Sequence, residues 1–260
     1  GRLFDICVKK SSELEHGKRK HKGRVVFGGN NVRDEFGLAA AFPEMGSGAS
    51  FATASKLLDA VSLLPGNYGE QSDAPSAYTQ SELFAGMKGD NCPETWIELP
   101  ESQWTDKWKK LHATTGQRPV CRLKKSLYGH PLSGLFWEKH YTTALTQRAG
   151  FQKMLGWECM FYHVELQVIL SVYVDDFKMA GRKENMSKAW QLMDKAGLKL
   201  DKPQQFGDYL GCGQAPITLT KEQVKDRLQH IDPIRIGSGG CSEPDGSAET
   251  KRNHPIRAIR

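Results

Sequence analysis

The most constraining feature of this chain is an apolar stretch that two adjacent acids interrupt. Residues 168–174 are almost entirely apolar, Asp175 and Asp176 follow at once, and residues 177–180 resume the apolar pattern. β-Branched and aromatic residues on both sides predict two strands. A two-residue acidic turn between them would place both carboxylates at the tip of a β-hairpin.

Such a tip carries an electrostatic cost. Two ionised carboxylates about 4 Å apart repel by about 4 kcal/mol at an effective dielectric of 20. The site should therefore raise the pKa of one acid or bind a cation, and oxygen ligands favour Mg²⁺ or Mn²⁺. An exposed Asp-Asp turn is the alternative, because Asp is a common turn former. The local pattern leaves both interpretations open.

Composition limits the classes of protein to consider. The chain has 260 residues, 38% of them hydrophobic, which is enough for one large domain or two small ones. The net charge of +6 suits a polyanionic partner only weakly. Residues 18–24 hold five Lys or Arg in seven positions, a run that forms either a solvated surface or a phosphate contact.

The six cysteines are scattered without a Cys-x-x-Cys pair, which argues against a zinc framework or a disulfide scaffold. Reduced thiols predict an intracellular protein. No apolar run approaches the roughly 20 residues that span a bilayer, and no signal-peptide pattern is visible. Because the chain begins at Gly1, we expect a piece of a longer polyprotein.

Local patterns predict the following elements. Residues 1–21 are expected to form an irregular basic segment, and residues 232–260 a flexible tail or partial connection. Strands are predicted at residues 24–27, 120–123, 161–164, 168–174 and 177–180. Helices are predicted around residues 57–64, which Pro65 and Gly66 end, at residues 135–148, and at residues 184–196. The apolar stripe of this last helix, at Met186, Ala189, Trp190 and Met193, indicates core packing.

The acidic pair also belongs to a motif. Tyr173-Val174-Asp175-Asp176 resembles the Tyr-x-Asp-Asp box of reverse transcriptases, and residues 173–181 are similar to the copia-type signature of LTR retrotransposons. Further segments resemble family motifs in the family's order: Lys22-Gly23-Arg24-Val25-Val26, the aspartate motif at residues 71–78, the Leu-Tyr-Gly motif within residues 120–129, and Asp208-Tyr209-Leu210-Gly211-Cys212. The resemblance covers about residues 22–231.

The resemblance implies a fold and an activity. The fold is α+β, a right-hand polymerase palm with an antiparallel sheet and helices on one face, plus fingers and a partial thumb; residues 22–231 would form the fingers and palm. The activity is that of an RNA-directed and DNA-directed DNA polymerase. Its partners would be a primed RNA or DNA template, dNTPs, and the integrase and ribonuclease H of the parent polyprotein, with no membrane. The implied location is intracellular, in cytoplasmic virus-like particles or the nucleus.

The same resemblance implies roles for particular residues. Asp73, Asp175 and Asp176 would be catalytic and hold two Mg²⁺ or Mn²⁺ ions, with the Ala74 carbonyl as a further ligand. The nucleotide would contact Lys22 and Arg24 at its triphosphate, Tyr78 at its sugar, and Tyr128 and Gly129 in the pocket. Tyr173 and Val174 would meet the primer and template. Without the resemblance, Asp73 is a turn residue, Tyr78 is core, and Lys22 and Arg24 belong to a solvated basic run.

Two other functions stay open. Pro75 and the unusual segment His130-Pro131-Leu132-Ser133-Gly134 depart from the family pattern, and they favour a degenerate retroelement fragment that binds nucleic acid without polymerising. An unrelated Mg²⁺ phosphohydrolase would need a phosphate-binding loop, and Gly46-Ser47-Gly48 lacks the Walker Gly-Lys-Ser/Thr.

Overall fold

A computed structural model describes residues 1–10, 20–34, 36–40, 52–84, 94–210, 213–214 and 217–229. The chain divides into two compact units, Gly1–Gln214 and Ala215–Arg260. Within the described residues, no helix has the length and apolar character needed to cross a membrane. The predicted tail at residues 232–260 lies outside the described residues, as do Gly46-Ser47-Gly48 and positions 211–212 of the last motif.

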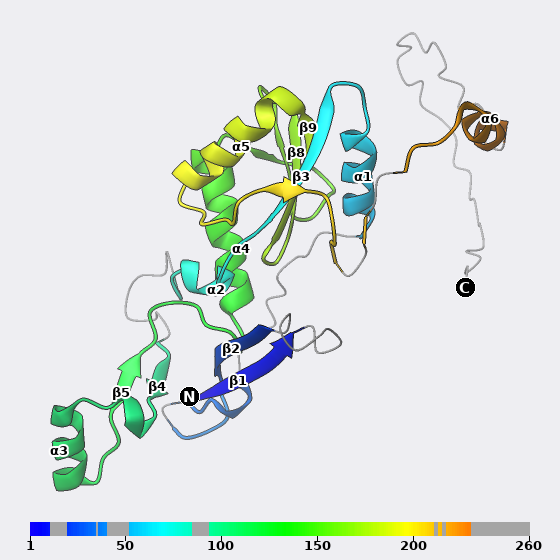
Figure 1. Cartoon of the computed structure of the whole chain (residues 1–260). Helices are drawn as coiled ribbons and strands as arrows, with labels where there is room; N and C mark the ends of the chain where they lie inside the picture. The colour runs from blue at the N-terminus through cyan, green and yellow to red at the C-terminus, as the bar shows by residue number, and fades with distance from the viewer. Residues whose placement is uncertain are drawn as a thin grey trace, which may run out of the picture. The chain divides into compact units, whose positions relative to one another are not determined.

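An antiparallel sheet of six strands forms the centre of the first unit (Figure 1). The strand order is β10-β3-β9-β8-β7-β6. The predicted hairpin is confirmed as β8 and β9, which pair in register from Val168 and Gly181 to Tyr173 and Asp176. The strands are β3 (Asn67–Asp73), β6 (Gln152–Lys153), β7 (Met160–His163), β8 (Val168–Tyr173), β9 (Asp176–Arg182) and β10 (Gln204–Gln205).

Helices cover both faces of this sheet, and the expectation of helices on one face is therefore wrong (Figure 1). One face packs against α4 (Ser133–Thr143) and α5 (Lys183–Lys195), and the other against α1 (Ala52–Ser62). The reason lies in β9, where residues 177–181 are all buried. A strand that is buried on both sides needs cover on both sides.

The main core lies between the sheet and the helices α4 and α5. The predicted stripe of α5 is confirmed as core, since its four apolar residues are all buried. Trp137 and Tyr141 of α4 pack edge to face against Phe177 of β9, with ring centroids 6.5 and 6.2 Å away. The predicted helix at residues 135–148 is also confirmed, although its last turn, Ala144–Arg148, is π-helical (η4).

The N-terminal segment forms a two-stranded ribbon. β1 (Leu3–Lys10) pairs antiparallel with β2 (Lys20–Phe27), so the expectation of an irregular segment at residues 1–21 is wrong for residues 3–10 and 20–21. The register aligns Phe4 with Val26, Ile6 with Arg24 and Val8 with Lys22. The side chains of β1 are mostly exposed, although Phe4, Ile6 and Val8 recur with the period of two that is typical of a strand. Pairing with β2 along its whole length holds β1 in the extended conformation.

A second small sheet pairs β4 (Trp96–Glu98) with β5 (Val120–Arg122), and α3 (Asp106–Thr115) lies between them in sequence. The Thr105 hydroxyl caps the start of α3 by accepting from the Trp108 amide, and Gly116 ends it in the left-handed region. The remaining described helices are η2 (Gly29–Asn31), α2 (Ala77–Gln80), η3 (Glu101–Gln103) and, in the second unit, α6 (Lys221–Gln229).

Candidate active site

The tip of the β8–β9 hairpin is displaced by one residue from the predicted turn. Tyr173 pairs with Asp176, so the two loop residues are Val174 and Asp175, and Asp176 opens β9. Only one of the two acids is therefore in the turn. The other is fixed by strand register.

Two hydrogen bonds hold this turn in a costly conformation. Val174 has φ of 55°, which a β-branched residue rarely adopts and which costs about 1–3 kcal/mol. The Trp137 indole Nε1 donates to the Val174 carbonyl at 2.6 Å, and the Ala74 amide donates to the Asp175 carbonyl at 2.7 Å. The backbone around the acidic pair is thus tied both to α4 and to the end of β3.

Strand register also brings in the third predicted acid. Asp73 ends β3 directly opposite Asp176 of β9. Burial, the negative charges of Asp175 and Asp73, and a hydrogen bond to Asp73 raise the pKa of Asp176 to about 6. The raised pKa is one of the two outcomes expected for crowded carboxylates. A protonated Asp176 can donate to the Asp73 carboxylate.

The side chains of Asp73, Asp175 and Asp176 are not arranged as a set of metal ligands in this structure. Across the part of the chain that the structure describes, no group of three or more His, Cys, Asp or Glu side chains is arranged to hold a metal ion. Asp73 is exposed, whereas Asp175 and Asp176 are half-buried. The donors are all carboxylate or carbonyl oxygens, which is the chemistry that Mg²⁺ and Mn²⁺ take.

Three of the predicted nucleotide residues lie together beside Asp175. The rings of Tyr78 and Tyr128 meet edge to face with centroids 4.8 Å apart, and the Arg24 guanidinium carbon lies 5.6 Å from the Tyr128 ring. Burial and then the Asp175 charge raise the pKa of both tyrosines. Lys22 is exposed and lies two residues before Arg24, on the same face of β2.

Gly129 permits a close approach between two backbone segments. A Cβ on Gly129, which has φ of 84°, would lie 2.2 Å from the Phe27 carbonyl oxygen. The Phe27 amide donates to the Tyr128 carbonyl at 2.7 Å. The close approach that glycine permits in this structure is to the end of β2. It joins the strand that carries Arg24 to the turn that carries Tyr128.

The unusual segment at residues 130–134 is explained by packing. The His130 ring is 4% exposed and lies 5.1 Å from the Phe27 ring, and its Nε2 lies 3.0 Å from the Thr95 hydroxyl. Ser133 bridges back to Leu127, accepting from its amide and donating to its carbonyl. Through these contacts, His130 and Ser133 hold the Tyr128–Gly129 turn in place.

Residues 199–209, which we call the strap, run along the site. The Asp201 amide donates to the Asp73 carbonyl at 2.8 Å, and the Ser72 hydroxyl donates to the Asp201 carbonyl. Two hydrogen bonds join Gln80, at the end of α2, to the backbone of Lys199. No local pattern in the sequence predicts these contacts, because they link residues far apart in the chain.

Comparison with known proteins indicates where the sequence of this chain comes from. Over 82 residues, 32% of its length, the chain is 35% identical to the Transposon Ty1-GR1 Gag-Pol polyprotein of Saccharomyces cerevisiae. Over the same length it is 34% identical to the Transposon Ty1-DR4 and Transposon TyH3 Gag-Pol polyproteins of that species. The matches cover 4–5% of these curated relatives. No family model matches the chain. The chain is thus related to part of a retrotransposon Gag-Pol polyprotein.

Proposed function

We propose that this chain is the polymerase portion of a retrotransposon Pol polyprotein, an RNA-directed and DNA-directed DNA polymerase. One observation carries the proposal. Strand register sets Asp73 opposite Asp176, beside the turn that holds Asp175. Tyr78, Tyr128 and Arg24 gather next to that turn. The relation to Gag-Pol polyproteins supports the same function.

The acids fit divalent cations through their chemistry. Asp73, Asp175 and Asp176, with the Ala74 carbonyl, would hold two Mg²⁺ or Mn²⁺ ions. Such ions, when bound, lower the pKa of a hydroxyl nucleophile and stabilise the charge on a leaving group. Burial first, and then the negative charges of Asp175 and Asp73, raise the pKa of Asp176, and a bound cation would relieve this crowding of charge by displacing the proton.

The surrounding residues would orient the nucleotide and the primer. The Arg24 fork suits bidentate contact with a triphosphate, and Lys22 on the same face adds a second charge. Tyr78 would pack under the sugar of a dNTP, with Tyr128 and Gly129 completing the pocket. Tyr173 and Val174 would face the primer and template, and the hydrogen bond from Trp137 holds the Val174 backbone in place.

Primer extension tests the proposal. With a primed template, dNTPs and Mg²⁺ or Mn²⁺, the chain should extend the primer, and Asp175→Asn should reduce the rate by at least about a hundredfold. The matched control is Asp194→Asn, which changes an exposed acid on α5 and should extend normally. Both variants should unfold at the wild-type temperature. Undiminished extension by Asp175→Asn would falsify the role of Asp175.

A second candidate, the degenerate fragment that binds nucleic acid without polymerising, is favoured by one local observation. Ser76, between Asp73 and Tyr78, follows Pro75 and has φ of 51°, a left-handed conformation that is costly for a residue other than glycine. This candidate predicts salt-dependent binding of a primed template with no extension in either metal. The same assay therefore separates the two functions.

A further inference from the structure

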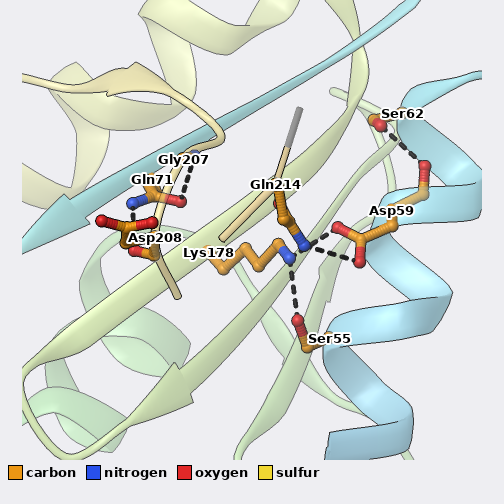
Figure 2. A network of polar contacts seen from close by, with 8 residues as sticks. All are labelled: Ser55, Asp59, Ser62, Gln71, Lys178, Gly207, Asp208 and Gln214. Atoms are coloured by element: carbon orange, nitrogen blue, oxygen red, sulfur yellow. Dashed lines mark hydrogen bonds and ion pairs between the residues drawn. The ribbon is translucent and has the colours of Figure 1, made fainter. Parts of the chain in front are cut away.

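A buried cation lies beneath the acidic pair. Lys178 is 0% exposed, although it sits in the otherwise apolar strand β9. Its ammonium donates to the Ser55 hydroxyl at 2.8 Å and to the Asp59 carboxylate at 2.5 Å, both on α1 (Figure 2). An ammonium withdrawn from water needs such partners, because an unpaired buried charge costs several kcal/mol. These two contacts explain how α1 is held against this face of the sheet.

The same ammonium also contacts the strap. It lies 4.4 Å from the centroid of the Phe206 ring and 4.8 Å from that of Tyr209, both within cation–π range. A Cβ on Gly69 of β3 would meet the Phe206 ring at 2.3 Å, so this ring lies directly on the sheet. Phe206 is thus held between the Gly69 backbone and the Lys178 ammonium.

Gln71 holds the backbone of the same segment. Its side-chain amide donates to the Asp208 carbonyl at 3.0 Å and accepts from the Gly207 amide at 3.1 Å (Figure 2). Gln71 is the register partner of Lys178, and Asp73 is the register partner of Asp176. The two pairs are two residues apart along their strands, so all four side chains lie on one face of the sheet. The strap is therefore held to the sheet two residues along the strands from Asp73 and Asp176.

The strap leads from this clamp to the site itself. Its upstream part donates to the Asp73 carbonyl through the Asp201 amide and is joined to α2, which carries Tyr78, through Gln80. If Phe206 and Tyr209 were released, these upstream hydrogen bonds would lose their support. The Asp59 carboxylate, which accepts from Lys178 through one oxygen, accepts from the Gln214 side-chain amide through the other at 2.8 Å. The polar network around Lys178 therefore extends beyond the strap.

We propose that Lys178 is a positioning residue, whose buried ammonium clamps the strap onto the sheet and through it fixes Asp73 and the helix of Tyr78. Ser55 and Asp59 hold the ammonium in place, and the ammonium in turn holds the rings of Phe206 and Tyr209. The placement of the strap does not depend on any activity of the chain. The consequence for catalysis rests on the polymerase function proposed above.

Amide hydrogen exchange tests the clamp without any substrate. Lys178→Met keeps the length of the side chain and removes the charge. The amides of Lys199, Asp201 and Gly207, which donate to Gln80, Asp73 and Gln71, should exchange at least about tenfold faster, a change of the size expected when one hydrogen bond is lost. The Val172 amide of β8, which donates to the Cys159 carbonyl, should keep its wild-type rate. Lys188→Met, an exposed change on α5, should alter none of these rates.

A second variant keeps the test decisive if Lys178→Met does not fold. Phe206→Leu leaves the ion pair with α1 intact and removes one ring partner, so it should accelerate the same three amides. Unchanged exchange at the strap in either folded variant overturns the proposal. Equal acceleration at Val172 in both variants also overturns it, because Lys178 would then serve only global stability.

Kinetics supply a separate arm. If the wild-type chain extends primers, Phe206→Leu should lower kcat and raise the KM for dNTP at a temperature where the variant stays folded. Lys188→Met should change neither. If the wild-type chain shows no extension, the proposed function fails while the exchange experiment still decides the clamp. Wild-type kinetics in Phe206→Leu, despite a loosened strap, would overturn the link to Asp73 and Tyr78.

Discussion

His130 acts at the scale of a single residue, through a ring that remains neutral. Its Nδ1 accepts from the Leu132 amide, so the proton of the neutral ring resides on Nε2, which faces the Thr95 hydroxyl as a donor. Burial lowers the pKa of His130 from 6.5 to about 4. The ring therefore accepts from the Leu132 amide only in its uncharged form, because a protonated Nδ1 has no free lone pair.

This pKa predicts a dependence of stability on pH. Between pH 6.5 and about 4, the unfolded chain binds a proton at His130 and the folded chain does not. The stability contributed by the neutral ring is thus complete above pH 6.5 and is lost on acidification to pH 4, by up to about 3 kcal/mol. His130→Gln lacks this term, so the gap in unfolding free energy between wild type and variant should narrow across that range.

Urea unfolding at several pH values measures the gap. Taking a difference between two chains cancels the other titrating groups, including Asp176, whose raised pKa acts in the opposite direction. His21→Gln, an exposed change of the same kind on β2, is measured in parallel as the matched control. A constant gap for His130→Gln would show that the ring titrates equally in both states.

Elements in this protein are joined where two backbones meet without side chains. A Cβ on Gly29 would lie 2.2 Å from the Gly129 carbonyl oxygen, just as a Cβ on Gly129 would meet Phe27. Both glycines thus stand at one junction, between the end of β2 and the turn before α4. Because neither glycine has a side chain, the two backbones can approach closely, and this contact fixes how Arg24 faces Tyr128.

A pair of variants separates the two costs at this junction. Gly129→Ala introduces both a left-handed alanine and a steric clash, and we expect it to destabilise the first unit by more than about 3 kcal/mol. Gly156→Ala has a similar φ of 76° with no atom within 4 Å, so it should cost only about 1 kcal/mol. Chemical denaturation of both variants gives the comparison. Equal losses would mean that the junction relaxes around the added methyl group.

The β8–β9 hairpin depends on a hydrogen bond from another element. Trp137→Phe removes the Nε1 donor, leaving the Val174 carbonyl without its 2.6 Å partner, and should lower the unfolding free energy by about 2–3 kcal/mol. It should also accelerate exchange of the Ala74 amide, which donates to the Asp175 carbonyl in the same turn. Trp190→Phe is the control, since its indole donates to Glu70 on β3. Equal Ala74 exchange in the two variants would sink the idea that α4 braces the turn.

At the scale of the whole chain, backbone hydrogen bonds close the first unit across long sequence distances. The Gly1 amine donates to the Trp96 carbonyl, and the Glu98 amide donates to the Gly1 carbonyl. The Leu83 amide donates to Lys124, and the Phe27 amide to Tyr128. These bonds link the β1–β2 ribbon, the small β4–β5 sheet and the site within Gly1–Gln214.

Truncation tests whether this unit is complete. A chain ending at Leu219 retains Gln214 and its bond to Asp59 and removes α6. We expect its thermal unfolding to remain a single cooperative transition within a few degrees of the full chain. A loss of more than about 10 °C would show that residues 220–260 contribute to the stability of the first unit.

The sequence by itself determined the elements that repeat a local pattern. Runs of β-branched and aromatic residues predicted β8 and β9, helical spacing predicted the core stripe of α5, and the acidic pair marked the hairpin between the strands. Motif order predicted that Asp73, Tyr78 and Tyr128 belong with Asp175. The predictions of the elements were confirmed because each depends on residues that are neighbours in the chain.

Only the tertiary structure decided the pairing of Asp73 with Asp176, the one-residue displacement of the turn, the cover of the sheet by α1, and the strap below the acids. Lys178 shows the reason. In the sequence, nothing near this lysine explains its place in an apolar strand. In the fold, its ammonium is surrounded by Ser55, Asp59, Phe206 and Tyr209. Its partners come from two distant segments, and the free energy of a buried charge depends on which groups the fold brings to it.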